Sequence, residues 1–420
     1  MQIEGIHYMN ERDRIALEDT VERRAEQRLR ILVSGGGSGG HIYPALSVAR
    51  ELQHRYRAEI LYLGDVDGLE TRLVPDAGFK LVTVHAGRLH RYWSARTVRD
   101  LAQVPRGFIE ARRHVRAFNP HAVFTSGGYV AVPAGFAANR MGVPLLIHQQ
   151  DVQPNLANKL LRPLATRISV SFEASLAFFP KNKTRLLGNP VREEILAVAG
   201  ADVRMHKPTL GFLPAFPLLV VTGGSQGARH INQAVTDALP KLLERFQILH
   251  ITGQLTYDET KAAAQAQLQG LPEHVANRYR IEPYLNAEMP IALAAADAVI
   301  SRSGAATLAE LAILGKPSIL IPLPPGFGGS PQETNAQTFT KQGAANVVLD
   351  KDTTGETLLA AISDLFATPE LRINMAQAAR TFARPRATQD LAAAVVGLAQ
   401  TYIEAKKKQA VMHAIQKAKQ

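Results

Sequence analysis

Short apolar runs alternate along this chain with longer segments in which apolar residues recur at helical spacing. The first run, Ile31-Leu32-Val33, leads into a glycine cluster and then into a helix pattern whose apolar positions run from Ala45 to Leu52. Pro44 lies near the expected first turn of that helix, where proline is tolerated. A second apolar run, Glu59 to Leu63, follows. Strand, loop, helix and strand on this scale form a βαβ unit, which predicts a parallel sheet.

The same plan returns further along the chain. A second helix is expected from about Pro133, and another from Ile231 to Leu242 after the glycine loop Gly223–Gly227. Six more strands are expected, at Ala122–Phe124, Leu145–His148, Leu218–Val221, Gln247–Thr252, Ala298–Ser301 and Ser318–Leu323. Because each half of the chain begins with strand, glycine-rich turn and helix, we predict an α/β protein of two Rossmann-like, doubly wound domains.

The pattern divides the chain into four zones. Residues 1–29 form a charged N-terminal extension, 30–188 a first α/β domain, 189–385 a second, and 386–420 one or two helices ending in a basic tail. The boundary between the two α/β domains is expected at the turn Leu187-Gly188-Asn189-Pro190. A chain of 420 residues with 46% hydrophobic composition is long enough for two separate cores.

Composition removes several classes of protein. The chain has no cysteine, which excludes disulfides, thiolate catalysis and cysteine-based metal sites. The first 30 residues lack the apolar core of a signal peptide, and no apolar run approaches the roughly 18 residues of a membrane-spanning helix. We therefore expect neither export nor integral insertion into a membrane.

The formal net charge of +11 directs attention to anionic partners. Eight arginines lie between Arg88 and Arg116, interleaved with aromatic and aliphatic residues, and further basic residues run from Lys406 to Lys419. Nucleic acid, anionic lipid and phosphate-bearing substrates would all suit this charge. Since no RNP, KH or zinc-finger pattern is present, we expect an anionic membrane surface and no nucleic acid.

Two glycine loops, Gly35–Gly40 and Gly223–Gly227, carry the candidate chemistry. A glycine-rich turn between a strand and a helix directs backbone N–H groups toward a phosphate at the positive end of the helix dipole. The first loop also fits a dinucleotide-binding G-x-G-x-x-G with Asp65 as the ribose acid, or a tight packing turn. The second also fits the G-x-S-x-G elbow of serine hydrolases around Ser225, although no later histidine is well placed for a triad.

Several short motifs together resemble the MurG family of peptidoglycan glycosyltransferases. The resemblance covers roughly residues 30–400 and keeps the family's motif order. The motifs that carry it are Ser34–Leu46, Ser126–Tyr129, His148–Asp151, Gly188–Arg192, Gly223–Ala228, Arg302–Ala305 with Glu310, and Asn335-Ala336.

This resemblance implies a GT-B fold, in which two Rossmann-like domains face a deep cleft. It implies inverting transfer of N-acetylglucosamine from UDP-N-acetylglucosamine to the 4-hydroxyl of the N-acetylmuramyl-peptide on undecaprenyl pyrophosphate, which converts lipid I to lipid II. The enzyme would act without a cofactor or bound metal, as a peripheral protein at the cytoplasmic face of the bacterial inner membrane. A GT-B transferase acting on another glycolipid or small-molecule acceptor is the alternative.

The resemblance also assigns residues. His41 and Asp151 are the candidate catalytic groups, since a histidine near neutral pKa suits removal of a proton from a sugar hydroxyl. The candidate residues for the donor are Ser38, Gly39, Arg192, Gly224, Ser225, Gln226, Gly227, Leu285, Ala305, Glu310, Gln332 and Asn335. Those for the acceptor diphosphate are Gly36, Gly37, Gly40, Gly127, Gly128 and Tyr129.

Within the donor set, the resemblance implies that the second glycine loop and Arg192 contact the UDP diphosphate. It implies that the backbone of Leu285 recognises uracil and that Glu310 contacts the ribose hydroxyls. Gln332 and Asn335 would contact the N-acetylglucosamine.

Some of these residues have simpler interpretations. Thr307 and Glu310 have the spacing of a helix capping box, and His148 after a strand could be a structural histidine. The family typically has His-Glu-Gln-Asn where this chain has His148-Gln149-Gln150-Asp151. Asp151 therefore either replaces a ligand-contacting asparagine or offers an alternative base.

Overall fold

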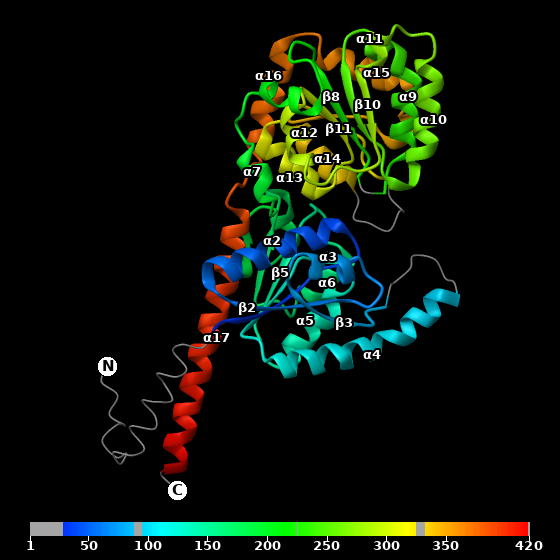
Figure 1. Ribbon diagram of the computed structural model, residues 1–420. Helices are drawn as coiled ribbons and strands as arrows, with labels where there is room; N and C mark the ends of the chain where they lie inside the picture. The colour runs from blue at the N-terminus through cyan, green and yellow to red at the C-terminus, as the bar shows by residue number, and fades with distance from the viewer. Residues whose placement is uncertain (1–27, 88–94, 225, 325–331, 419–420) are drawn as a thin grey trace.

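The computed structural model describes residues 28–87, 95–224, 226–324 and 332–418. These residues form two wholly parallel β-sheets, each covered by helices, which lie one above the other in Figure 1. The prediction of an α/β protein with two Rossmann-like domains is thereby confirmed.

The first sheet has the strand order β3-β2-β1-β4-β5-β6-β7. Its strands are β1 (Arg30–Ser34), β2 (Glu59–Asp65), β3 (Lys80–Val84), β4 (Ala122–Thr125), β5 (Leu145–Gln149), β6 (Arg167–Val170) and β7 (Thr184–Leu186). Its helices are α2 (Gly39–Tyr56), α3 (Glu70–Asp76), α4 (Ala95–Phe118), α5 (Ala131–Arg140) and α6 (Leu156–Leu161), with 3-10 turns η2 (Glu173–Phe178) and η3 (Lys181–Lys183). The reversal of order at β1 and β4 is the switch point at which such sheets bind ligands.

The second sheet repeats this topology, in the order β10-β9-β8-β11-β12-β13. Its strands are β8 (Leu218–Thr222), β9 (Gln247–Ile251), β10 (Tyr279–Glu282), β11 (Ala298–Ser301), β12 (Ser318–Leu320) and β13 (Asn346–Val347). The connection from the first sheet carries α7 (Glu193–Ala197), α8 (Val203–His206) and η4 (Pro208–Leu210). Its switch point therefore lies between β8 and β11, beside the second glycine loop.

Helices cover both faces of the second sheet as well. They are α9 (Arg229–Leu243), α10 (Tyr257–Leu268), α11 (Glu273–Ala276), α12 (Met289–Ala295), α13 (Ala305–Leu314), α14 (Gln332–Lys341), α15 (Gly355–Leu365) and α16 (Pro369–Arg380), with η5 (Gln254–Thr256) and η6 (Asp350–Asp352). The chain ends in α17 (Ala387–Ala418).

Strand residues alternate between the two faces of each sheet, and each face has its own core. In β1, Ile31 and Val33 join the core shared with α2, whereas Leu32 joins the core shared with α4 and α5. All five residues of β8 are buried, as expected for a parallel strand with helices on both faces. Burying one valine, leucine or isoleucine side chain completely stabilises the fold by about 1.5–3 kcal/mol.

Helix α17 returns from the second domain to the first. In Figure 1 it runs down the side of the lower domain, and its inward side chains pack against α2 and β4. Those side chains recur at helical spacing and are Leu391, Ala392, Val395, Val396 and Ala399. The expected C-terminal basic tail is therefore a continuation of a helix that helps to form the first core.

Most predicted strands are confirmed within one or two residues, but two local expectations are wrong. Helix α2 begins at Gly39, so Pro44 is its sixth residue and lies in the second turn rather than the first. The strand expected at Ser318–Leu323 ends at Leu320, where the chain leaves the sheet. The domain limits at 29, 188 and 385 remain predictions.

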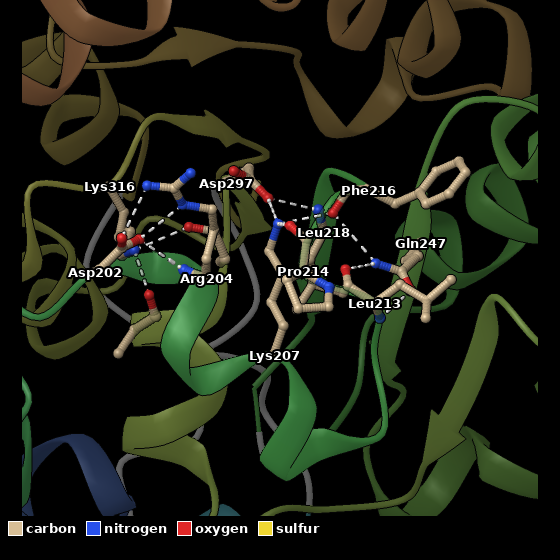
Figure 2. Close-up of polar contacts among 12 residues, drawn as sticks. Asp202, Arg204, Lys207, Leu213, Pro214, Phe216, Leu218, Gln247, Asp297 and Lys316 are labelled. Carbon is tan, nitrogen blue, oxygen red and sulfur yellow. Dashed lines mark hydrogen bonds and ion pairs between the residues drawn. The ribbon is translucent and has the colours of Figure 1, made fainter.

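The connection between the sheets is anchored by a buried lysine. Lys207 donates to the carbonyl oxygens of Phe216 (2.7 Å) and Pro214 (3.3 Å), and its Nζ lies 2.8 Å from a carboxylate oxygen of Asp297 (Figure 2). The same oxygen accepts from the backbone N–H of Leu218 at 2.7 Å. The start of β8 is thus fixed by the Lys207–Asp297 ion pair, since both of its side chains also form hydrogen bonds with backbone groups.

A second lysine, Lys316, is also buried, and its altered pKa should make the free energy of unfolding depend on pH. Its Nζ donates to the carbonyl oxygens of Ala294 (2.6 Å) and Ala296 (2.9 Å), and burial lowers the pKa of Lys316 to about 8. Because the unfolded chain then binds more protons between pH 8 and 10.5, the free energy of unfolding should rise with pH in this window. From pH 7.5 to 9.5 we expect a gain of about 2 kcal/mol that the Lys316→Met variant lacks, measured by denaturant titration. Parallel pH profiles of the two proteins would contradict this.

Candidate active site

The first glycine loop lies between β1 and α2. Ser38 precedes the helix with extended backbone angles, its side chain makes no capping hydrogen bond, and the first turn of α2 contains no acidic residue. The backbone N–H groups at this helix start are therefore not capped by a side chain of the helix itself. This is the arrangement that binds anions at a helix N-terminus.

A second glycine segment, Gly127-Gly128, lies directly against the first loop. The N–H of Gly36 donates to the carbonyl oxygen of Gly127 at 3.3 Å. A β-carbon on Gly128, whose φ is +85°, would lie 2.1 Å from the carbonyl oxygen of Gly36. The close approach and the left-handed backbone both require glycine there. The structure thus brings the predicted acceptor residues together, while their role stays a prediction.

Tyr129 and Asp65 support this loop from the side of the sheet. The Tyr129 hydroxyl donates to an Asp65 carboxylate oxygen at 2.9 Å, and the Tyr129 ring lies beside Gly37. The other Asp65 oxygen accepts from the N–H of Ala86 at 3.3 Å. Asp65 is only 5% exposed, so the acid that a dinucleotide site would use for ribose is engaged by the protein itself.

His41, in the first turn of α2, is held by the segment after β4. Its Nδ1 lies 3.1 Å from the carbonyl oxygen of Ser126, and the Ser126 hydroxyl donates to the His41 carbonyl at 2.6 Å. The side-chain amide of Gln150 donates to the same Ser126 carbonyl at 2.9 Å and lies 3.2 Å from Nδ1. A carbonyl oxygen only accepts, so a proton on Nδ1 leaves Nε2 as the basic nitrogen.

Burial and charge act on His41 in opposite directions. Burial lowers the pKa of His41 below its ordinary value, while the nearby Asp151 carboxylate and the Ser126 carbonyl act to raise it. The net direction is downward, so the neutral imidazole that a general base requires predominates at neutral pH.

Asp151 bridges the two domains through Asn335. Asn335, in α14, donates to an Asp151 carboxylate oxygen at 2.8 Å and accepts from the N–H of Val152 at 2.9 Å. It also donates to the carbonyl oxygen of Ser303 at 3.0 Å, and its side chain is fully buried. The residue expected to contact the donor sugar thus lies inside the contact between the domains, with its amide engaged by protein groups.

Apolar contacts extend this junction between the domains. Val152 and Phe172, from the first half of the chain, belong to the core of the second domain, where the Phe172 and Phe339 rings meet edge to face at 6.4 Å. Burial raises the pKa of Tyr284 to about 12, and a hydrogen bond with Tyr43 of α2 contributes to this rise. The first turns of α2 therefore lie beside the uracil-binding segment predicted around Leu285.

The second glycine loop follows β8 in the same way that the first follows β1. Gly224 and Gly227 both have positive φ, and the N–H of Gly227 donates to the Gly224 carbonyl at 3.0 Å. A β-carbon on Gly227 would lie 2.4 Å from the carbonyl oxygen of Thr252, so this loop packs tightly against the end of β9. Gln226 is exposed, and Ser225 lies outside the described residues.

Arg192 and Glu310 are brought together, although they are 118 positions apart. Arg192 Nε donates to Glu310 Oε1 at 3.0 Å, and burial raises the pKa of Glu310 although Arg192 opposes this. Helix α13 begins at Ala305 with Gly304 as its N-cap, which makes Thr307 the third helical residue. The capping-box interpretation of Thr307 and Glu310 is therefore wrong, and the carboxylate is available for another role.

Of the other predicted donor residues, Ala305 begins α13 and Gln332 lies beside the segment that precedes it. Gln332 begins α14, accepts from the Ser303 hydroxyl through its backbone carbonyl at 2.9 Å, and accepts from the N–H of Leu323 through its side chain at 3.1 Å. Leu285 is 6% exposed in the core of the second domain. The contacts of all these residues with a nucleotide sugar remain predictions.

His148 is a structural histidine. It is fully buried, its Nδ1 lies 3.1 Å from the Ser169 hydroxyl, and its Nε2 lies 3.0 Å from the side-chain oxygen of Asn189. Burial lowers its pKa to about 4, so it is neutral at physiological pH. Gln149, at the family's glutamate position, donates to the backbone carbonyls of Asp151 and Gln153 and thereby shapes the loop that carries Asp151.

Sequence reasoning missed three residues of this region: Gln150 beside His41, Tyr43 at the domain junction, and Glu70 beneath the first glycine loop. Gln150 lies within the motif His148–Asp151, so the resemblance had indicated this segment but not this residue. Glu70 is 33 positions from the loop and only its burial at a helix start distinguishes it.

Part of the basic stretch Arg88–Arg116 is visible in α4. Residues 88–94 lie outside the described part of the chain. In its second half, Ala111 and Val115 are buried against the first domain, whereas Arg112, Arg113 and Arg116 are exposed. Among the helices that the structure describes, none has the length and apolar character needed to cross a membrane.

Comparison with known proteins agrees with this geometry. Residues 31–170 match the glycosyltransferase family 28 N-terminal domain, and residues 218–391 match the glycosyltransferase family 28 C-terminal domain. A crystal structure of MurG from Acinetobacter baumannii superposes with a TM-score of 0.69 at 27% identity, over 88% of this chain and 99% of that one.

Two relatives bear the name UDP-N-acetylglucosamine–N-acetylmuramyl-(pentapeptide) pyrophosphoryl-undecaprenol N-acetylglucosamine transferase. The one from Desulforamulus reducens is 43% identical over 86% of this chain and 97% of its own length. The one from Desulfitobacterium hafniense is 41% identical over 86% of this chain and 96% of its own. Because both halves match this glycosyltransferase family and the relatives are 41% and 43% identical over nearly their whole length, the chain belongs to the MurG family of glycosyltransferases.

Proposed function

We propose that this enzyme transfers N-acetylglucosamine from UDP-N-acetylglucosamine to the 4-hydroxyl of the N-acetylmuramyl-peptide on undecaprenyl pyrophosphate. The observation that carries this proposal is the 43% identity to a transferase of that name over 97% of the relative's length. The contact between the two glycine segments beside His41 supports it, because it provides an anion site next to a base.

The acceptor half of the reaction uses the first domain. With the diphosphate on the N–H groups of the first glycine loop, the attacking hydroxyl lies toward the first turn of α2. His41 Nε2 takes the hydroxyl proton as the oxygen forms its bond to the anomeric carbon of the donor. The Ser126 carbonyl oxygen, 3.1 Å from Nδ1, accepts the Nδ1 proton and so orients the ring for this transfer.

The donor half uses the second domain. As the bond from the anomeric carbon to UDP breaks, negative charge develops on the diphosphate. The N–H groups around Gly224 and Gly227 and the Arg192 guanidinium stabilise that charge without reorganisation. Glu310 fixes Arg192 in the unliganded protein and is a hydrogen-bond acceptor for the ribose hydroxyls.

We further propose that the protein works as a peripheral enzyme at the cytoplasmic face of the bacterial inner membrane. Its lipid-linked acceptor requires contact with a membrane surface. The exposed arginines Arg112, Arg113 and Arg116 on α4 supply positive charge, each contributing about 1 kcal/mol near anionic lipid.

The direct test is transfer of radiolabelled N-acetylglucosamine from UDP-N-acetylglucosamine to a short-chain lipid I analogue. We expect a product containing both sugars, together with one UDP for each transfer. A glycolipid lacking the muramyl-peptide serves as the control acceptor. UDP binding without transfer to the lipid I analogue would rule out this acceptor and favour the alternative glycolipid or small-molecule class.

Replacing the base should slow chemistry without weakening donor binding. We expect His41→Ala to lower kcat by roughly 10²- to 10⁴-fold, because proton transfer loses its positioned base. The KM for UDP-N-acetylglucosamine should change little. His148→Gln provides the matched control at a buried histidine, and full turnover by His41→Ala would remove His41 from the base role.

The charge of Asp151 should set the acid limb of the pH profile. Since this carboxylate raises the pKa of His41, Asp151→Asn should lower that pKa and shift the acidic fall of kcat/KM to lower pH. The asparagine side-chain oxygen still accepts from Asn335, so the junction between the domains is kept. An acid limb that does not move would show that Asp151 does not act on the base.

A further inference from the structure

Glu70 is a buried carboxyl group next to the first glycine loop. It begins α3, is fully buried, and accepts the N–H of Gly37 through Oε1 at 3.3 Å. Its other oxygen, Oε2, is buried without a hydrogen-bond partner among the described residues. Buried carboxylates are ordinarily paired with a cation, and Glu70 takes part in none of the ion pairs among the described residues. A buried carboxyl group without a cation is costly in free energy, and this one lies beneath the proposed anion-binding loop, which suggests a role in function.

Glycines on two segments make room for this carboxyl group. A β-carbon on Gly36 would lie 1.6 Å from Glu70 Oε1, and one on Gly68 would lie 2.0 Å from Oε2. A β-carbon on Gly64 would lie 2.9 Å from the Glu70 β-carbon. Glu70 is therefore fitted into space that side chains at these positions would fill, and Gly36 belongs to the predicted acceptor site.

The groups that face Glu70 are acidic or weakly acidic. Burial raises the pKa of Glu70; backbone N–H groups, including that of Gly37, oppose this, and the Asp65 carboxylate adds to it. Tyr62 of β2 is also close enough to interact with the Glu70 charge. Burial raises the pKa of Tyr62, and the negative charge of Glu70 raises it further. Tyr129 reaches Asp65 from beyond β4.

The remaining titratable groups on the elements around α3 are mostly exposed. They are Arg72 and Asp76 on α3 itself, Glu59 at the start of β2, Lys80 at the start of β3, and Tyr43, Arg50, Glu51, His54, Arg55 and Tyr56 on α2, besides His41.

We propose that Glu70 is a positioning residue for the acceptor, and that the acceptor diphosphate binds the first glycine loop with Glu70 in its neutral, protonated form. This inference rests on the proposed function. A diphosphate diester brings two negative charges to N–H groups beside a buried carboxylate, and like charges in a low-dielectric site disfavour each other's ionised form. The carbonyl oxygen of a neutral carboxyl group still accepts from Gly37, so the loop keeps its shape while the repulsion is removed.

The first experiment measures the acceptor KM as a function of pH. If binding requires the neutral acid, the KM for the lipid I analogue should rise by up to about tenfold per pH unit once Glu70 ionises in the free protein. We expect this rise in the wild type above the pH at which Glu70 ionises, and no such rise in Glu70→Gln. Glu59→Gln, at the exposed start of the neighbouring strand β2, is the matched control and should retain the wild-type profile.

Glu70→Ala separates positioning from folding. We expect the acceptor KM to rise at least about tenfold at every pH while the donor KM is unchanged, with Glu70→Gln restoring much of the affinity. An unchanged acceptor KM, or an equal rise in both KM values, would overturn the proposal. So would a wild-type pH profile in Glu70→Gln.

A double-mutant cycle tests the contact itself. Gly36→Ala should lower kcat/KM for the acceptor, since its β-carbon needs the space of Glu70 Oε1. The same change in a Glu70→Ala background should cost much less, whereas additive effects would show that the two groups do not compete. If the wild type fails to glycosylate the lipid I analogue, the proposed function fails. If the wild type transfers normally and the Glu70 variants have the same acceptor kinetics as the wild type, only this inference fails.

Discussion

The backbone contact between Gly36 and Gly128 is the constraint on which the proposed active site depends. The two segments approach so closely that a β-carbon at residue 128 would lie 2.1 Å from the carbonyl oxygen of Gly36. This approach sets where α2 begins, and hence where His41 lies. It also brings the carbonyl of Ser126 to the His41 ring at 3.1 Å. A side chain at either glycine would separate the proposed anion site from His41, the proposed base.

Charge in the site is controlled by burial more than by ion pairing. The imidazole of His41 is kept neutral by burial, with Asp151 acting against it, and His148 is neutral for the same reason. Glu70 is buried without a cation, whereas Glu310 has Arg192 at 3.0 Å. The proposed acceptor side thus contains acids and neutral histidines, while the proposed donor side contains Arg192, a residue type that can stabilise a departing diphosphate.

The junction between the domains uses residues for which the family resemblance implies contact with ligand. Asn335 hydrogen-bonds Asp151, Val152 and Ser303 and has no exposed surface. In this chain an aspartate stands where the family typically has asparagine, and its carboxylate accepts directly from the donor domain. Helix α17 adds a second connection, because it leaves the second domain and completes the core of the first. The relative position of the two domains therefore depends on the hydrogen bonds of Asn335 and on the packing of α17 against the first domain.

Sequence by itself determined the strands with unbroken apolar runs, such as β1, β8 and β11, and both glycine loops, because burial on two faces and left-handed turns leave local signatures. It did not reveal β3 and β10, which are edge strands with mixed, half-buried residues. It also did not reveal β6, β7 and β13, which are short strands of four, three and two residues. Only the tertiary structure decided that Glu70 lies under Gly36, that Gln150 lies beside His41, and that Asn335 meets Asp151. Those pairs are 34, 109 and 184 positions apart, and no local pattern encodes a contact that sheet order and domain packing create.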